Sequence, residues 1–372
     1  MINILFISIT SSTGGGPAHI YSILKNIDRT KFNTFVVSPN DGEYFEKFKL
    51  YSNVIDIDLR HNYLKNILKI KKIVKDNNIH ICHSHGRGAG IYSRPLKIIK
   101  SSLKVVHTFH GIHYERCGAI KKFLNLTVEG LLRNFTDCCI AVSQKEYEEA
   151  LRLKMAKKNH IYMIYNGIEI DKFNVNIEKK LVLRKLGIDI SDYKYIVGCF
   201  GRLHYEKGQL NLIKAFKKFN MEYPDSLLLL IGDGPDKSLI LDSIKEFKLE
   251  NNVELRGFQS NIPELLQSID LYVSSSYKEG LPYILIEALA SKTLVVATRT
   301  TGNDEIIFDK KTGLLCEVGN PDSLCEKMIE IKKRPNDNEK YIQNGIEMVK
   351  QRFDIKIMIE KLSKIYEEIL CD

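Results

Sequence analysis

The sequence predicts an α/β protein of two successive Rossmann-like domains that face each other across a cleft. In the first half, short β-rich runs alternate with helical periods, as in a parallel sheet wrapped by helices. A polar, charged stretch then extends through Lys180 and reads as a linker, and the same alternation starts again after it. At 372 residues, the chain is long enough for two domains of ordinary size.

The first half contains seven apolar runs that we interpret as buried strands. They are INILFISI, NTFVVSP, VIDIDL, IHICHSHG, KVVHTFHG, CCIAVS and HIYMIYNG. Helical periods stand between several of them, at residues 19–26, 64–75 and 119–134. In the period 64–75 we expect an apolar face to point inward and a basic face to point outward; these are Leu64, Ile67, Leu68 and Val74 against Lys65, Lys69, Lys72 and Lys75.

The second half repeats the pattern with five further runs, YIVGCFGRL, LLLLIGDG, NVELRGF, LYVSSS and TLVVATRT. A last helix, near residues 355–370, has apolar residues at the spacing of a packing face, and could fold back onto either domain, of which we expect the N-terminal one. We therefore expect domains at 1–175 and 176–352, with a C-terminal helix at 353–372. Ligands of such sheets bind beyond the carboxyl ends of the strands, so the loops after strands are the candidate sites.

Composition and cysteine usage are those of a soluble cytoplasmic protein. Hydrophobic residues make up 44% and charged residues 27% of the chain. The eight cysteines are scattered without a C-x-x-C motif, which favours free thiols in a reducing compartment. The N-terminal segment lacks the basic start and the cleavage site of a signal peptide. The longest mostly apolar stretch, residues 280–298, contains Glu287 and Lys292, which makes it a poor membrane span.

The net charge of +9 favours an anionic partner. No nucleic-acid-binding motif accompanies this charge, so nucleic acid is not expected as a partner. The basic helix predicted at 64–75 is either a solvated surface helix or a patch that contacts the anionic inner face of the cytoplasmic membrane.

The stretch SSSYKEGLPYILIEALAS carries the most chemical information. A strand ends near Ser274, a polar loop follows, and Pro282 stands where a helix could begin. Gly280 would let a ligand approach the free N–H groups of that helix, which bind phosphate well. Glu279 lies before the helix and Glu287 follows Glu279 by about two turns, as carboxylates that hydrogen-bond sugar and ribose hydroxyls would.

The stretch GCFGRLHYEKG follows another strand that ends at Phe200. Gly201 permits a turn, and Arg202 and Lys207 then lie in one loop before a helix. An arginine fork and a lysine point charge can together hold a diphosphate without a metal ion.

Three histidines in VVHTFHGIH, His107, His110 and His113, are expected around the end of one strand. No carboxylate or cysteine completes a zinc site at ligand spacing, so we expect a histidine that hydrogen-bonds a substrate hydroxyl rather than a metal ligand. The simple D-x-D motif, Asp56 and Asp58, lies in an alternating strand and is not expected to bind metal.

Taken together, these segments resemble glycosyltransferase family 4, the retaining transferases of the GT-B fold. GRLHYEKG, LLLIGDGP, VELRGF and above all EGLPYILIE resemble its C-terminal half. TGGGPAHI, FHGIH, AVSQ and IYNGIEIDKF stand, in the same order, where that family has its N-terminal motifs. The resemblance covers nearly the whole chain and implies an N-terminal acceptor-binding domain and a C-terminal nucleotide-sugar donor domain.

The resemblance also implies a role for individual residues. Glu279 would contact hydroxyls of the transferred sugar, and Glu287 would hold the ribose. Arg202 and Lys207 would neutralise the diphosphate, and His110 would lie near the reacting sugar. The remaining donor contacts implied are Gly15 and Gly16 from the N-terminal loop, Gly201, the backbone of Gly280 and Leu281, and Arg256 and Phe258 beside the base.

The implied reaction is retaining, metal-independent transfer of a hexose or N-acetylhexosamine from a nucleoside-diphosphate sugar. The resemblance to this family also implies UDP as the nucleotide, and a sugar or lipid-linked sugar of a bacterial surface polysaccharide as the acceptor. Two departures from the family pattern, Lys292 in place of a common glycine and Thr301 in place of the first of two glycines, bear on donor fit.

Three other functions remain open from the residues alone. An NAD-dependent dehydrogenase would need a third glycine where His19 stands, and neither glycine-rich loop completes G-x-G-x-x-G. A nucleotide-sugar epimerase shares the expected architecture but needs no acceptor. A non-catalytic nucleotide-sugar-binding subunit would not need the charged residues described above.

Overall fold

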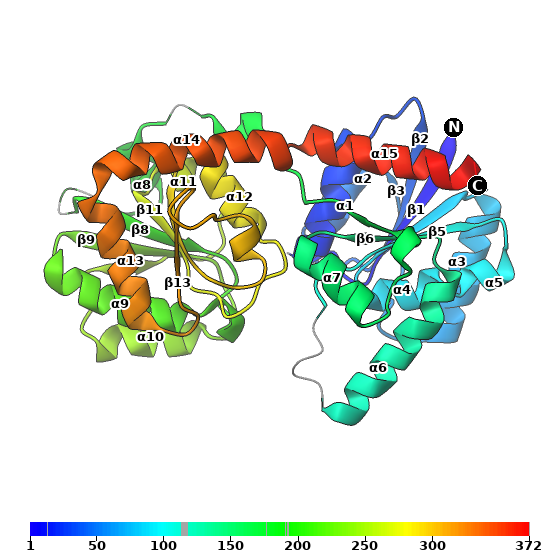
Figure 1. Cartoon of the computed structure of the whole chain (residues 1–372), viewed down its shortest axis with the longest axis horizontal. Helices are drawn as coiled ribbons and strands as arrows, with labels where there is room; N and C mark the ends of the chain where they lie inside the picture. The colour runs from blue at the N-terminus through cyan, green and yellow to red at the C-terminus, as the bar shows by residue number, and fades with distance from the viewer. Residues whose placement is uncertain (13, 113–117, 176, 190, 192, 372) are drawn as a thin grey trace. The chain divides into compact units, whose positions relative to one another are not determined.

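The computed structural model describes residues 1–12, 14–112, 118–175, 177–189, 191 and 193–371. The chain divides into two compact units (Figure 1). Unit 1 comprises Met1–Gly167 together with Ile355–Asp372, and unit 2 comprises Ile168–Asp354. The stretch expected to be a linker belongs to unit 2, where Ile168 pairs with Asp354 and residues Lys179–Lys185 form a helix.

Unit 1 is built on a parallel sheet of seven strands in the order β3-β2-β1-β4-β5-β6-β7. The strands are β1 Ile2–Ser8, β2 Phe32–Ser38, β3 Asn53–Asp56, β4 Ile81–His85, β5 Lys104–Thr108, β6 Cys138–Ala141 and β7 Ile161–Met163. The strand expected over residues 54–59 therefore ends at Asp56, and Asp58 lies beyond it.

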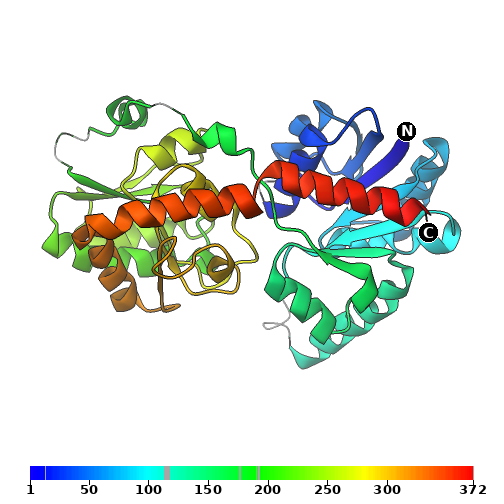
Figure 2. The same cartoon turned by 45° about the horizontal axis from the view of Figure 1, so that its top comes forward.

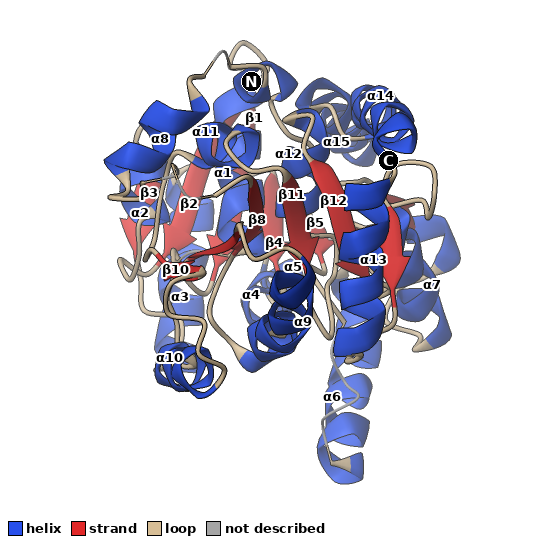
Figure 3. Cartoon of the chain, turned by 90° about the vertical axis from the view of Figure 1, so that its left-hand side faces the viewer, coloured by secondary structure: helices blue, strands red, loops and turns tan. Residues whose placement is uncertain are grey.

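Helices cover both faces of this sheet (Figure 3). They are α1 Gly15–Asn26, α2 Tyr44–Lys49, α3 Tyr63–Asp76, α4 Arg87–Ser93, α5 Leu96–Ile99, α6 Ala119–Leu132, α7 Gln144–Arg152 and α15 Ile355–Cys371. One apolar core joins the sheet to α1 and α15, and a second joins its other face to α3, α4 and α5.

Helix α15 packs on the N-terminal domain, as the apolar face of the last helix predicted. Its residues Met358, Leu362 and Tyr366 are buried in the core that contains Ile20 and Leu24 of α1. Both chain termini consequently lie in unit 1 (Figure 2).

Unit 2 has a second parallel sheet, with six strands in the order β10-β9-β8-β11-β12-β13. The strands are β8 Tyr195–Phe200, β9 Ser226–Ile231, β10 Val253–Leu255, β11 Leu271–Ser274, β12 Leu294–Thr298 and β13 Leu314–Cys316. The helices are α8 Lys179–Lys185, α9 Gln209–Glu222, α10 Lys237–Glu246, α11 Ile262–Gln267, α12 Tyr283–Ala290, α13 Pro321–Lys333 and α14 Pro335–Arg352. The two sheets confirm the predicted pair of Rossmann-like domains and have the architecture of the GT-B fold.

The orientation predicted for α3 is partly wrong. Val74 is buried and Ile67 is half-buried, but Leu64 and Leu68 are exposed, 75% and 64% respectively. The inward face is formed by Asn66, Ile70 and Val74, because Asn66 donates hydrogen bonds to the carbonyl oxygens of Asp58 and His61 at the start of the helix. The apolar residues at positions 64 and 68 therefore lie on the same outward side as the lysines.

The cysteines that the structure describes are free thiols, and six of these seven are buried. Burial raises the pKa of Cys82, Cys139 and Cys199, so these thiols are unreactive core residues. Within the described ranges, the helices are too short or too polar for any of them to cross a bilayer.

Candidate functional site

In unit 2, the loops after β8 and β11 form one small pocket at the carboxyl ends of these neighbouring strands. Its lining includes Phe200, Lys207, Ser276, Glu279 and Ile284. The two loops were singled out separately in the sequence, and the strand order β8-β11 brings them together. The pocket thus lies at the sheet edge where ligands of parallel α/β folds bind.

Lys207 and Glu279 form an ion pair across this pocket. The Lys207 Nζ lies 2.6 Å from Oε1 of Glu279, whose side chain is only 11% exposed. Ser276 Oγ donates a hydrogen bond of 2.6 Å to the same carboxylate oxygen. The two residues were expected to contact different parts of a ligand, and the structure pairs them with each other.

Backbone contacts fix the two loops against each other. Ser275 Oγ donates to the carbonyl oxygen of Lys207 at 2.9 Å, and the N–H of Tyr277 donates to the carbonyl of Glu206 at 2.8 Å. A Cβ at Gly208, which has φ +66°, would lie 2.2 Å from the Ser275 carbonyl oxygen. This close approach requires glycine and makes the pocket a rigid structure.

Arg202 carries a solvent-accessible positive charge next to this pocket. Its side chain is exposed and forms no ion pair with any residue the structure describes, whereas its carbonyl oxygen accepts a hydrogen bond from Gln209 Nε2 at 2.9 Å. It follows Gly201, whose φ of +151° lies outside the range open to other residues. The backbone of the loop is therefore anchored while the guanidinium remains accessible to an anion.

Glu287 lies in α12, which begins directly after Pro282 as predicted. Burial raises the pKa of this carboxyl group to about 7. At the preceding loop, a Cβ built on Gly280 would meet open space, and Leu281 is buried. A carboxyl group that is half ionised near neutral pH is well suited to accept hydrogen bonds from a pair of hydroxyls, which would favour its charged form.

Gly302 explains how the Glu279–Gly280 backbone is supported. A Cβ at Gly302 would lie 2.2 Å from the carbonyl oxygen of Gly280, so only glycine fits there. The departure at Lys292 lies at a strained backbone position. Lys292 follows the end of α12 with φ +62°, a helix C-terminal position where glycine is normally preferred.

Arg256 and Phe258 follow β10 at the far edge of the sheet. Arg256 Nη2 lies 2.9 Å from Glu254 Oε2, and Phe258 is 57% exposed. An exposed aromatic ring beside a held guanidinium can stack on a planar base, so the base contact expected of these residues stays a prediction.

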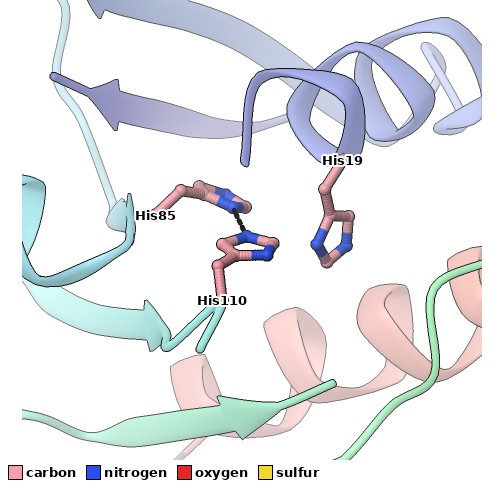
Figure 4. Close-up of side chains that lie close together, drawn as sticks. All are labelled: His19, His85 and His110. Carbon is pink, nitrogen blue, oxygen red and sulfur yellow. Dashed lines mark hydrogen bonds between the residues drawn. The ribbon is translucent and has the colours of Figure 1, made fainter. Parts of the chain in front are cut away.

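In unit 1, His19, His85 and His110 come together from α1, the end of β4 and the loop after β5 (Figure 4). His85 Nδ1 and His110 Nε2 share a hydrogen bond of 2.9 Å, and their rings stack with centroids 5.2 Å apart. His19 meets both rings edge-on, at 5.3 Å and 4.9 Å. One nitrogen from each of the three rings lies within 4.8 Å of the others, a grouping that could coordinate a transition metal.

The histidine group differs from the one expected in the sequence. His107 lies on the opposite face of the sheet, where its Nδ1 shares a 2.9 Å hydrogen bond with Ser84 Oγ. The reason is the alternation of side chains along β5, and His113 lies outside the described residues. A further histidine, His83, extends the group through a 2.6 Å hydrogen bond to the Tyr366 hydroxyl on α15.

Burial keeps these rings neutral. It lowers the pKa of His110 and of His83 to about 3, and lowers that of His19 and His85 well below the ordinary value. Neutral imidazoles can exchange hydrogen bonds with a hydroxyl but do not act as acids near pH 7. His110 has one nitrogen committed to His85, which leaves its Nδ1 for another partner.

Two features of the chain place His110. Its φ of +59° is uncommon for a residue with a side chain. The carboxylate of Glu146, on α7, holds this turn by accepting hydrogen bonds from the N–H groups of Gly111 and Val142.

Gly15 and Gly16 lie in the first turn of α1 rather than in the expected loop, and a Cβ at Gly16 would be 3.9 Å from His110 Cδ2.

Sequence reasoning missed His19, His85 and Glu146 as members of this group. The pattern CHSHG at the end of one strand and HTFHG at the end of the next was the available signal for His85. No comparable signal pointed to Glu146, because its contact with Gly111 depends on how β5 and β6 pair.

Comparison with known proteins adds two family matches. Residues 13–172 match the model described as Glycosyltransferase Family 4, and residues 187–348 match the model described as Glycosyl transferases group 1. The two matches follow each other along the chain and together cover most of both units.

Individual proteins resemble most of the chain. The N-acetyl-alpha-D-glucosaminyl L-malate synthase of Bacillus anthracis is 28% identical over 82% of this chain and 78% of its own length. The UDP-Gal:alpha-D-GlcNAc-diphosphoundecaprenol alpha-1,3-galactosyltransferase of Escherichia coli is 24% identical over 82% and 80%. The crystal structure of Anabaena Alr3699/HepE in complex with UDP and glucose superposes with a TM-score of 0.87 at 21% identity, covering 99% of this chain and 100% of that one.

Proposed function

The chain belongs to the glycosyltransferases of family 4, and from this premise we propose that it is a retaining, metal-independent hexosyltransferase that uses a UDP-sugar. The transferred group would be a hexose or an N-acetylhexosamine. The acceptor would be a sugar or a lipid-linked sugar in the synthesis of a bacterial surface polysaccharide, on the inner face of the cytoplasmic membrane. The observation that carries the proposal is the Lys207–Glu279 pair, with Arg202 exposed beside it.

The residues of unit 2 divide the donor between them. Arg202 and Lys207 would neutralise the diphosphate as it becomes the leaving group, together with the N–H groups of Gly280 and Leu281 at the start of α12. Glu279 would accept hydrogen bonds from sugar hydroxyls, and it already sits 2.6 Å from the Lys207 ammonium. Glu287 would accept the ribose hydroxyls, and Arg256 and Phe258 would flank the base.

From unit 1, His110 would hydrogen-bond a hydroxyl of the transferred sugar, and the N–H groups of Gly15 and Gly16 would face the diphosphate. The pKa of about 3 keeps His110 neutral, so its role is to orient the sugar rather than to protonate it. The positive charges needed by the leaving group come from side chains, and no step requires a metal ion.

Two similar proteins support the choice of substrates. HepE is described in complex with UDP and glucose, and the Escherichia coli relative is named for a sugar linked to diphosphoundecaprenol. A membrane-bound acceptor of this kind would also give a role to the positive net charge of this chain.

Thermal unfolding with UDP, GDP, ADP or NAD, each with and without EDTA, tests the proposal. A ligand at about a hundred times its dissociation constant adds roughly 2.7 kcal/mol of stability. We expect a clear shift with UDP that EDTA leaves unchanged. A shift with NAD alone, or a UDP shift that EDTA abolishes, would contradict it.

The products of the reaction separate transfer from the alternatives. With UDP-sugar and an acceptor, NMR should show a new glycosidic bond with the anomeric configuration of the donor. Interconversion of the UDP-sugar without an acceptor would instead indicate an epimerase, and binding without turnover a non-catalytic subunit.

A further inference from the structure

Helix α6 of unit 1 turns its apolar residues outward, to solvent. Ile120, Phe123 and Leu131 are 79%, 70% and 62% exposed, and Leu124 and Val128 are exposed as well. Their spacing of three and four residues places all five on one side of the helix. Figures 1 and 3 show α6 standing away from the sheet of unit 1.

The opposite side of α6 attaches the helix to the protein, through polar contacts and through Leu126, which packs against an apolar core that includes Phe109. Glu129 is fully buried, and its Oε2 lies 2.6 Å from Nη1 of Arg94, which is also fully buried. Arg87 donates a hydrogen bond to Asn125 of α6 and lies 3.8 Å from Glu129. A surface helix normally exposes a polar side, whereas α6 exposes an apolar face and buries an ion pair on its other side.

The buried ion pair fixes this orientation of α6. Turning the apolar side inward would carry Glu129 away from Arg94 and leave a buried guanidinium without its carboxylate, which is strongly unfavourable. Isolated exposed apolar residues are ordinary, but five on one fixed helix face form a contiguous patch of the kind that marks an interaction site.

The charges near this face favour an anionic partner. The single acidic residue of α6 is the buried Glu129, and Lys121 is exposed beside the apolar side. Helix α3 carries a similar mixture, with Leu64 and Leu68 exposed among outward lysines. Helix α4 contacts both α3 and α6, since the Tyr63 hydroxyl donates to the Ile91 carbonyl and Arg87 donates to Asn125.

We propose that the outward face of α6, formed by Ile120, Phe123, Leu124, Val128 and Leu131, inserts into the surface of an anionic lipid bilayer. Apolar side chains would enter the boundary between headgroups and acyl chains, while Lys121 and the lysines of α3 meet anionic headgroups. This inference rests on the proposed function, because it locates the membrane surface that a lipid-linked acceptor would occupy.

Co-sedimentation of the full chain with phosphatidylcholine vesicles, with and without phosphatidylglycerol, tests the inference. We expect binding to the anionic vesicles that weakens as salt is added. The triple variant I120S/F123S/L131S should bind about tenfold more weakly or worse, because three side chains no longer enter the bilayer. A matched control, M221S/L239S, removes residues that are 77% and 54% exposed in unit 2 and should bind as the unmodified chain does.

Unchanged binding of the triple variant, or no binding by the unmodified chain, would overturn the inference. A dimer that the triple substitution converts to monomer, without vesicle binding, would also overturn it and assign the face to a second copy. The UDP-induced thermal shift, measured on the same three proteins, shows separately whether the proposed function holds. All three should give the same shift, since α6 lies outside unit 2.

Discussion

The two clusters of functional side chains are built on different physical principles. The pocket of unit 2 is formed by two loops that follow neighbouring strands. Backbone contacts that require glycine and the Lys207–Glu279 pair hold the loops together. The histidine group of unit 1 comes from three separate segments and consists of rings that burial keeps neutral. The pocket of unit 2 is thus lined by charged groups, which the proposed diphosphate would need, and the histidine group consists of neutral rings, from which the proposal asks only hydrogen bonding.

The largest effect should come from breaking the charged pocket. We expect Glu279→Gln to lower the transfer rate by about a hundredfold or more, as loss of a preorganised charged group does in other active sites. The substitution removes the negative charge that we propose faces the sugar hydroxyls, and it ends the ion pair with Lys207. A radiolabelled-donor assay measures this, with Glu206→Gln in the adjoining loop as a control that should stay near full activity. Equal rates for the two variants would remove Glu279 from the reaction.

A smaller effect should follow from disturbing the histidine group. His85 acts on His110 through their 2.9 Å hydrogen bond, so His85→Ala should lower kcat about tenfold and leave the KM for the donor unchanged. His85→Asn should restore part of the rate, because an amide can take the place of Nδ1. His107→Asn, on the opposite face of the sheet, should leave kcat unchanged. A change in KM alone would mean that His85 does not position His110.

The two units should respond to acid in opposite directions between pH 7 and 5. Six histidines of unit 1 have a lowered pKa, so the unfolded chain takes up protons below pH 6.5 that the native unit does not; they are His19, His80, His83, His85, His107 and His110. The free energy of unfolding of unit 1 therefore falls as the pH drops below 6.5, by up to about 1.4 kcal/mol per pH unit for each proton, and these histidines leave it unchanged above that pH. In unit 2, burial raises the pKa of Glu287 to about 7, so native unit 2 takes up a proton there and gains stability as the pH falls.

Hydrogen–deuterium exchange, corrected for the intrinsic pH dependence of exchange, resolves the two units in the full chain. Protection of the core strands should fall in unit 1 and rise in unit 2 over this range. Glu287→Gln should abolish the gain in unit 2 without affecting unit 1. Parallel losses in both units would contradict the assignment.

The smallest effect concerns the backbone beside the pocket. Lys292→Gly should raise the free energy of unfolding by about 1 kcal/mol, because Lys292 adopts φ +62° just after α12. Lys214→Gly, in the middle of α9, should lower it by about the same amount, because glycine is a poor helix former. Urea denaturation measures both. The same sign for the two substitutions would show that the conformation at position 292 does not determine the effect.

The comparison also shows what the sequence could predict. Local patterns placed the strand ends at Phe200 and Ser274 and the start of α12, because each depends on a few neighbouring residues. The Lys207–Glu279 pair could not be predicted, since it depends on β8 lying next to β11. The grouping of His19 with His85 and His110 likewise needs the packing of α1 on the sheet.

The inward face predicted for α3 was partly wrong because a buried polar contact set the orientation of the helix. Apolar residues were assigned to the inward face of α3, but hydrogen bonds of Asn66 and the packing of Ile70 set its orientation. In α6 the buried Arg94–Glu129 pair does the same. Hydrophobic periodicity identifies a helix, whereas a buried polar contact can decide which side faces the core.

The most direct test of the account is hydrogen–deuterium exchange of the full chain with and without UDP-glucose. The account predicts slowed exchange in two segments of unit 2. They are the loop at residues 201–208 and the loop and start of α12 at residues 276–287, which contain Arg202, Lys207, Glu279 and Glu287. Protection that is absent from both loops at saturating ligand would contradict the assignment of this pocket to the nucleotide-sugar.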